Sequence, residues 1–181
     1  MAATTALMTV DEFLKLPDIE EQRVELIQGA VTPMAGAGLV HEFVKGNLNE
    51  ILTLWLSQRR IGRLFVETSY RVDEHDSLIP DLSVLSNDRL PVPVTNDLPR
   101  GAPELAIEVV SSESAARLRT KIDLYLKHGG KAVWVVYPEQ RVIEIHNANG
   151  QIRKLEQNQI LEDHDALPGF TTPVSAIFKG L

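Results

Sequence analysis

The sequence of 181 residues contains no cysteine. This absence excludes a disulfide-stabilised fold, a thiolate zinc site and a cysteine nucleophile. A membrane-spanning run is also missing, because a spanning helix needs about 20 consecutive apolar residues and the most apolar stretch covers only residues 132–137. The N-terminal residues have no basic region and lead directly into Asp11 and Glu12, unlike a secretory signal. We therefore expect a soluble, cytoplasmic protein.

Positive charge is scarce as well, since 18 Lys and Arg against 25 Asp and Glu give a net charge of −7. An extended, sequence-independent grip on nucleic acid normally needs many cations that neutralise phosphates, so that mode is disfavoured. Local contacts remain open, because Arg59, Arg60 and Arg63 form a run without an intervening acid and the segment 113–131 is also rich in basic residues. Each cluster alone is more typical of a solvated helix face.

Several common catalytic motifs do not occur. There is no Gly-x-Ser-x-Gly, P-loop or Gly-x-Gly-x-x-Gly sequence, which disfavours α/β-hydrolases, NTPases and dinucleotide enzymes. Four histidines (His75, His128, His146 and His164) lack the spacing of zinc ligands, so a histidine-rich zinc site is not expected.

The composition that is present, 44% hydrophobic and 24% charged, is that of a globular protein, and the length predicts a single domain over residues 1–181. Thr9 and Glu12 have the spacing of a capping box, which predicts a short helix over 10–16. Apolar residues at three- and four-residue steps predict a long helix after residue 38 that Gly62 ends, and Ser111 or Ser112 should cap a further helix that ends at residues 128–130.

Strands are predicted between these helices. Alternating or continuous apolar residues indicate strands at 64–72, 79–85, 104–110 and 132–137, with hairpins formed by 24–31 and by 142–146 with 151–155. The expected class is therefore α/β, with a mixed sheet flanked by helices and added hairpins near both ends.

Two carboxylates interrupt this apolar pattern. Asp81 follows Pro80 at the start of a predicted strand, and Glu108 lies inside the apolar strand 104–110. Burying an unpaired charge there would cost several kcal/mol, so a partner is required. A divalent cation shared by Asp81 and Glu108 is one solution, because hard oxygen ligands suit Mg²⁺. A strand-end glutamate paired with an arginine is an equally good alternative.

Lys121 should lie near this pair. The chain advances about 13 Å from Glu108 to Ser112 at the rise of a strand, and a helix from Glu113 to Lys121 returns about 12 Å. If helix and strand are antiparallel, Lys121 comes level with Glu108 and can point inward from the edge of the apolar stripe. The alternative is a surface lysine whose stem packs while its ammonium stays in water.

The sequence resembles the Uma family of proposed endonucleases, within the restriction-endonuclease-like PD-(D/E)XK superfamily. The resemblance runs from about Thr9 to the C-terminus, and six motifs carry it: Arg23 to Gly29, His41, Pro80-Asp81, Glu108 to Ser111, Lys121 to Tyr125, and Val133 to Val136. It implies a core of strands flanked by two helices, in agreement with the order predicted from the pattern.

The resemblance also implies roles for individual residues. The family's two carboxylates match Asp81 and Glu108 as ligands of Mg²⁺, which Mn²⁺ could replace, and Glu25 matches an acid proposed to complete the site. The superfamily lysine normally stands two residues after the acid, where this chain has Val110, and a lysine of the next helix, here Lys121, is taken to substitute.

The chain departs from the family pattern at four positions without losing a proposed ligand: Ser112-Glu113 replace a common Pro-Ser, Arg117 a frequent Asp and Gly130 a frequent Val.

We therefore expect a Mg²⁺-dependent endonuclease that hydrolyses phosphodiester bonds in DNA. His41, Arg117 and Arg119 are candidates for substrate contacts, although His41 at a helix start is more often structural. A homodimer is expected, because two sites would suit cleavage of two strands and two-fold dimers are the commonest oligomers. The alternative is a non-catalytic scaffold of the same fold that binds nucleic acid or a protein.

Overall fold

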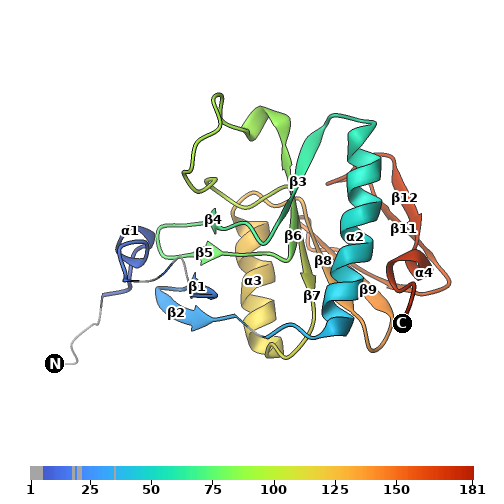
Figure 1. Cartoon of the computed structure of the whole chain (residues 1–181), viewed down its shortest axis with the longest axis horizontal. Helices are drawn as coiled ribbons and strands as arrows, with labels where there is room; N and C mark the ends of the chain where they lie inside the picture. Colours follow the sequence, from blue (N-terminus) through green and yellow to red (C-terminus); the bar gives the residue numbers. More distant parts are fainter. Residues whose placement is uncertain (1–5, 18, 20–21, 35) are drawn as a thin grey trace.

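The computed structural model describes residues 6–17, 19, 22–34 and 36–181. Its centre is a six-stranded sheet with the order β10-β9-β8-β7-β6-β3 (Figure 1). These strands are β3 (Gly62–Val66), β6 (Leu82–Ser86), β7 (Leu105–Val109), β8 (Ala132–Tyr137), β9 (Val142–Asn147) and β10 (Ile152–Glu156). β7 and β8 pair in parallel and the other neighbours are antiparallel. The predicted mixed sheet is confirmed.

Four short strands form a second sheet with the order β2-β1-β5-β4: β1 (Val24–Ile27), β2 (Ala30–Pro33), β4 (Tyr70–Arg71) and β5 (Ser77–Leu78). A separate hairpin joins β11 (Ile160–Asp163) to β12 (Phe170–Pro173). The helices are α1 (Val10–Phe13), α2 (Leu39–Ser57), α3 (Ala115–Lys127) and α4 (Val174–Ile177), with a 3-10 turn at Asn87–Arg89. In the described part of the chain, no helix is long and apolar enough to cross a membrane.

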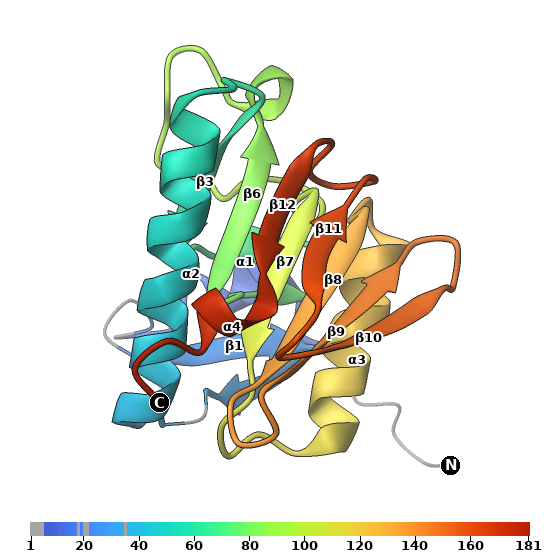
Figure 2. The same ribbon diagram turned by 90° about the vertical axis from the view of Figure 1, so that its right-hand side faces the viewer.

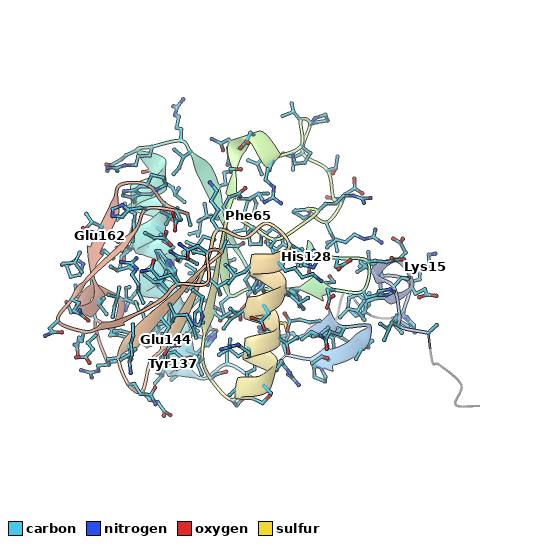
Figure 3. All side chains as sticks on the ribbon, turned by 180° about the vertical axis from the view of Figure 1, so that it is seen from behind. Lys15, Phe65, His128, Tyr137, Glu144 and Glu162 are labelled. Atoms are coloured by element: carbon cyan, nitrogen blue, oxygen red, sulfur yellow. The ribbon has the colours of Figure 1, made fainter. Side chains whose placement is uncertain are left out.

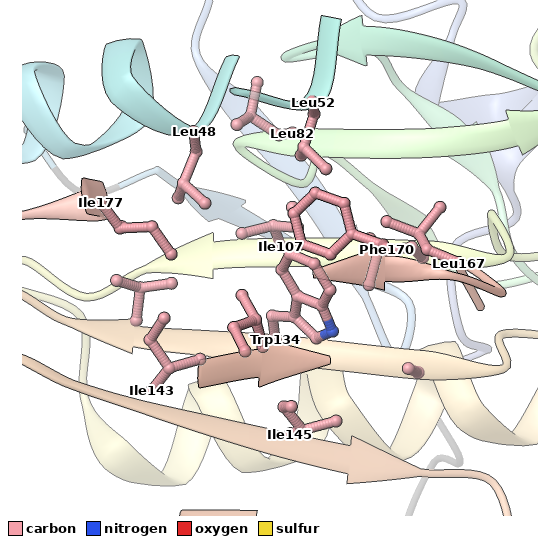
Figure 4. Close-up of a cluster of buried hydrophobic side chains, with 14 of the residues drawn as sticks. Leu48, Leu52, Leu82, Ile107, Trp134, Ile143, Ile145, Leu167, Phe170 and Ile177 are labelled. Carbon is pink, nitrogen blue, oxygen red and sulfur yellow. The ribbon is translucent and has the colours of Figure 1, made fainter. Parts of the chain in front are cut away.

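The two faces of the large sheet are covered by different elements. α2, α4 and the β11–β12 hairpin lie over one face, and α3 with the small sheet lies over the other (Figure 2). On the first face, fully buried Trp134 packs against Phe170, with ring centroids 5.6 Å apart (Figure 4). Burying one large apolar side chain contributes about 1.5–3 kcal/mol. The apolar clusters on the two faces therefore hold α2 and α3 against the sheet.

α3 makes the crossover between the two parallel strands β7 and β8. It leaves the end of β7, returns along the sheet and is closed by His128, Gly129 and Gly130, as predicted. Beyond it, β8 and β9 run side by side, where the Tyr137 hydroxyl donates to Glu144 at 3.2 Å (Figure 3). This crossover brings the middle of α3 back beside β7.

The structure corrects two predicted boundaries around β3. α2 ends at Ser57 and not at Gly62, which instead begins β3. A glycine fits this position because a Cβ there would lie 2.6 Å from the carbonyl oxygen of Leu85. The strand predicted over 64–72 is interrupted at Glu67, whose φ of 46° lies in the left-handed region. The chain therefore leaves the large sheet after β3 and enters the small one at β4.

Other boundaries differ in smaller ways. The predicted strand 79–85 begins only at Leu82, as β6 of the large sheet, and the residues just before it, Ser77–Leu78, form β5 of the small sheet. α3 is capped by Ser114, which accepts from the Arg117 N–H, and not by the serines at 111 or 112. The hairpins β1–β2 and β9–β10 are confirmed, as is the capping box at α1, while the β11–β12 hairpin was not predicted.

Candidate active site

A polar pocket opens where α2 begins and β7 ends. Glu25 comes from β1, His41 from the first turn of α2, Asp81 from the residue before β6, Glu108 from β7 and Lys121 from α3. The full lining is Arg23, Glu25, Met34, Ala37, His41, Asp81, Glu108, Val109, Ser111, Glu113 and Lys121. The three candidates Asp81, Glu108 and Lys121, far apart in sequence, thus meet in one place together with Glu25.

Lys121 is buried at the centre of this pocket, with 3% of its surface exposed. Its Nζ lies 2.9 Å from Oε1 of Glu108 and 3.1 Å from Oε1 of Glu25. Burial disfavours the ammonium, but Glu108, Glu25 and Glu113 outweigh that effect and raise the pKa of Lys121. The alternative of a surface lysine with its ammonium in water is therefore wrong, and Lys121 carries its positive charge inside the protein.

Glu108 uses both of its carboxylate oxygens. Oε2 accepts from Nζ of Lys121 at 3.0 Å, and Oε1 accepts from the hydroxyl of Tyr125 at 2.9 Å. Burial raises the pKa of Glu108, and nearby Asp81 and Glu25 add repulsion in the same direction, while the ammonium of Lys121 acts against both. Shifted pKa values of this kind are common among the residues of functional sites.

Asp81 joins the start of β6 to β7 and α2. Its Oδ2 accepts from the backbone N–H of Val109 at 2.7 Å, while its Oδ1 lies 3.1 Å from Nε2 of His41. Burial disfavours the imidazolium, but hydrogen bonds to Asp81 and Glu42 prevail and raise the pKa of His41. His41 therefore holds Asp81 in place from the first turn of α2.

Glu25 reaches the pocket from the small sheet. It is 1% exposed, and its Oε1 accepts from the backbone N–H of Ile79 at 2.8 Å as well as contacting Lys121. Glu113, at the start of the crossover, is half-buried in the same pocket, and burial raises its pKa.

A second charge cluster contacts Asp81 through the backbone of Glu67. Nζ of Lys45 is 2.8 Å from Glu42 and 2.7 Å from Glu67, and Arg23 lies 3.2 Å from Glu67. The backbone N–H of Glu67 donates to the carbonyl oxygen of Asp81 at 3.2 Å. The strained turn at Glu67 is thus bonded to the residue that begins β6, and non-glycine residues in this conformation concentrate at functional sites.

The structure does not bring the two predicted arginines into the pocket lining. Arg117 donates from its guanidinium to the carbonyl oxygen of Pro33 at 2.8 Å. Arg119 is exposed on α3, and its Nε lies 3.9 Å from Asp123. Both remain on the helix that borders the pocket, outside the carboxylate cluster.

The sequence interpretation missed Tyr125 as a partner of Glu108, and also Arg23, Lys45 and Glu67. For Tyr125 a signal existed, because it stands four residues after Lys121 and therefore on the same face of α3. Lys45 and Glu67 carried no comparable signal, since their contact depends on the break after β3.

The donor set of the pocket fits a hard cation that keeps part of its hydration shell. Asp81 and Glu108 offer carboxylate oxygens, and Mg²⁺ is typically held by one or two carboxylates with water and substrate phosphate. Within residues 6–17, 19, 22–34 and 36–181, no three His, Asp or Glu side chains surround a common metal position. Two carboxylates would leave most of the coordination sphere of such a cation to water and substrate.

The mixed sheet, its two flanking helices and the buried acid–acid–lysine cluster define a protein of the restriction-endonuclease-like class. The chain belongs to the Uma2 family, described as "Putative restriction endonuclease", whose model matches residues 10–175. This membership confirms the resemblance found in the sequence and supports a nuclease-like role.

Two individual proteins are similar to the chain. An uncharacterised protein of Synechocystis sp., sll1609, is 29% identical over 121 residues, which cover 64% of this chain and 65% of that relative, less than two thirds of its length. A crystal structure from Anabaena variabilis, described as "a putative nuclease belonging to DUF820", superposes with a TM-score of 0.83 at 22% identity, over 94% of this chain and 97% of that one. The second likeness confirms the fold.

Proposed function

We propose that the protein is a Mg²⁺-dependent endonuclease that hydrolyses phosphodiester bonds in DNA. The observation that carries this proposal is the meeting of Asp81, Glu108 and Lys121 in one pocket of a fold shared with the Uma2 family. Nuclease chemistry needs ligands for a cation and a positive charge near the transferred phosphate, and these three side chains supply both.

Asp81 and Glu108 would hold the cation, with Mn²⁺ as a substitute for Mg²⁺. Such a cation polarises the phosphate and lowers the pKa of a bound water. The backbone N–H of Val109 and the imidazole of His41 fix the orientation of Asp81, so that its carboxylate does not need to reorganise when substrate arrives.

Lys121 serves as a fixed positive charge and not as a base. Because the neighbouring carboxylates raise its pKa, the ammonium stays protonated at neutral pH and can stabilise negative charge on the phosphate oxygens or orient the attacking water. Glu25 contacts the same ammonium from the small sheet and therefore positions it.

Calorimetric titration with Mg²⁺ and Mn²⁺, paired with a cleavage assay on DNA, tests this proposal. Asp81→Asn and Glu108→Gln preserve shape and remove ligand charge, so each should weaken metal binding and abolish cleavage together. Asp123→Asn is the matched control, because its carboxylate is 71% exposed on α3 and should leave both properties unchanged. DNA binding without metal binding or cleavage would support the scaffold alternative and overturn the enzyme.

We also propose that the protein works as a two-fold homodimer, which places two pockets on one DNA molecule. One subunit of 20.1 kDa with a net charge of −7 offers few cations for phosphate contacts. Sedimentation equilibrium at micromolar protein should therefore give about twice the chain mass. A mass near that of one chain would contradict the dimer.

A further inference from the structure

Tyr125 stands one helical turn beyond Lys121 on α3 and is completely buried. Its hydroxyl donates to Oε1 of Glu108 at 2.9 Å. The ring packs in the apolar cluster between α3 and the large sheet, and this packing holds the hydroxyl against the carboxylate. A fully apolar phenylalanine would fill the same space, which makes the hydroxyl the informative part of this residue.

Glu108 is held from α3 at both of its carboxylate oxygens. Among the described residues, the Tyr125 hydroxyl donates to Oε1 at 2.9 Å and Nζ of Lys121 donates to Oε2 at 3.0 Å, while the same Nζ lies 2.9 Å from Oε1. Because a carboxylate oxygen can accept about two hydrogen bonds, each oxygen keeps an acceptor site, and the Tyr125 hydroxyl fixes how the carboxylate is turned.

We infer that Tyr125 is a positioning residue that holds the Glu108 carboxylate, through Oε1, in the orientation that binds the cation. This inference rests on the proposed function, because it assigns Tyr125 a role toward the cation of that site. Burial and the surrounding carboxylates raise the pKa of Tyr125 well above its usual value, so the hydroxyl stays protonated and acts as the hydrogen-bond donor.

A hydrogen-bond partner that orients a metal ligand typically changes metal affinity by about 10- to 100-fold when it is removed. Tyr125→Phe deletes the hydroxyl alone and frees Oε1 for a second, competing orientation. We therefore expect the Mg²⁺ affinity of Tyr125→Phe to fall by about 10-fold, with the KM for DNA unchanged at saturating Mg²⁺.

Tyr70→Phe is a closely matched control. Tyr70 is also completely buried, belongs to the same apolar cluster and loses a comparable hydrogen bond, since its hydroxyl lies 2.8 Å from Oγ of Ser83. Both variants should lower the melting temperature by similar amounts, but Tyr70→Phe should bind Mg²⁺ like the unmodified protein. A merely structural role for Tyr125 predicts no difference between the two variants in metal affinity.

Calorimetry with Mg²⁺ on both variants decides between these outcomes. Unchanged affinity in Tyr125→Phe overturns the inference even if the protein cleaves DNA. If the unmodified protein binds no Mg²⁺, the proposed function fails first, and the orientation of the Glu108 carboxylate in crystals of Tyr125→Phe becomes the separate readout. A rotated carboxylate then supports the positioning role, and an unchanged one overturns it.

Discussion

Nζ of Lys121 lies 3.0 Å from Oε2 and 2.9 Å from Oε1 of Glu108, although the two residues belong to different elements. The contact forms because α3 returns antiparallel to β7 within a single crossover connection. It also pairs a carboxylate and an ammonium that are both removed from water, since Glu108 is 6% exposed and Lys121 is 3% exposed.

Lys121→Met should reduce both catalysis and stability. Removing the ammonium leaves Glu108 and Glu25 buried without a counter-charge, and breaking a buried pair in this way costs about 3–5 kcal/mol. The cleavage rate should fall by about 10²- to 10³-fold, as for loss of one preorganised donor, while Mg²⁺ affinity should stay equal or rise because a repelling charge is gone. Urea unfolding without metal, calorimetry and single-turnover cleavage measure the three effects.

Lys45→Met is the matched control for Lys121→Met. Lys45 also contacts two carboxylates, but those of Glu42 and Glu67 are 45% and 31% exposed, so water compensates them. We expect a loss of stability within about 1 kcal/mol. Wild-type cleavage by Lys121→Met at saturating Mg²⁺ would show that Lys121 has only a structural role.

Arg119→Ala should weaken DNA binding without affecting the fold. Arg119 is 68% exposed, so its removal should change stability by less than about 0.5 kcal/mol. If it contacts a phosphate, DNA affinity should fall similarly for all sequences, and the slope of log affinity against log salt should decrease by about 1. Lys154→Ala, an exposed cation on β10 at the edge of the large sheet, is the control. An unchanged salt slope in Arg119→Ala would exclude this arginine from the DNA contact.

Acid should loosen the long loop 87–101 through Glu104. Burial favours the neutral acid, but the backbone N–H of Ser86 and the guanidinium of Arg89 prevail and lower the pKa of Glu104 below 4.5. Because its folded pKa is lower than its unfolded pKa, Glu104 contributes stability above about pH 4.5 that is lost as the pH falls through the folded value. Arg89→Met should raise the pKa and begin this loss at higher pH, which stability curves from pH 3 to 7 can measure. Identical curves for both proteins would contradict the assignment.

Asp163→Ala should weaken the attachment of the β11–β12 hairpin to the large sheet. Asp163 accepts from the indole Nε1 of Trp134 at 2.7 Å and from the backbone N–H groups of Asp165 and Ala166 at 3.0 Å. Leaving the buried donors of Trp134 and Ala166 unpaired costs about 1–3 kcal/mol. Tryptophan fluorescence during urea unfolding should show a lower midpoint, whereas His164→Ala, at 76% exposure, should not.

The sequence predicted those parts of the fold whose causes are local. The capping box of Thr9 and Glu12 and the hairpin of 142–146 with 151–155 each need only neighbouring residues, and both are present. The continuous apolar run of β8 likewise predicted a central strand, because only burial on both faces explains it. The approach of Lys121 to Glu108 followed from the lengths of one strand and one helix.

The remaining features depend on contacts between distant segments. Nothing in the alternating pattern around Glu67 marks a break, since no glycine or proline stands there, and the left-handed turn is held by Lys45, Arg23 and Asp81. The β11–β12 hairpin is fixed by Trp134 from a distant strand. The hydrogen bond from Tyr125 could have been predicted, because Tyr125 stands one helical turn beyond Lys121 and the sequence analysis had already brought Lys121 level with Glu108.

The ammonium of Lys121 also acts as a joint between the two sheets. Glu25 belongs to the small sheet and Glu108 to the large one, and one positive charge lies in contact with both carboxylates. Separating the sheets would take Glu25 away from Lys121. Conversely, a ligand in the pocket that neutralises either carboxylate would weaken the contact between the sheets. Ligand binding and the contact between the two sheets are therefore thermodynamically linked, so amide exchange in β1 should respond to a ligand in the pocket that Glu25, Glu108 and Lys121 line together.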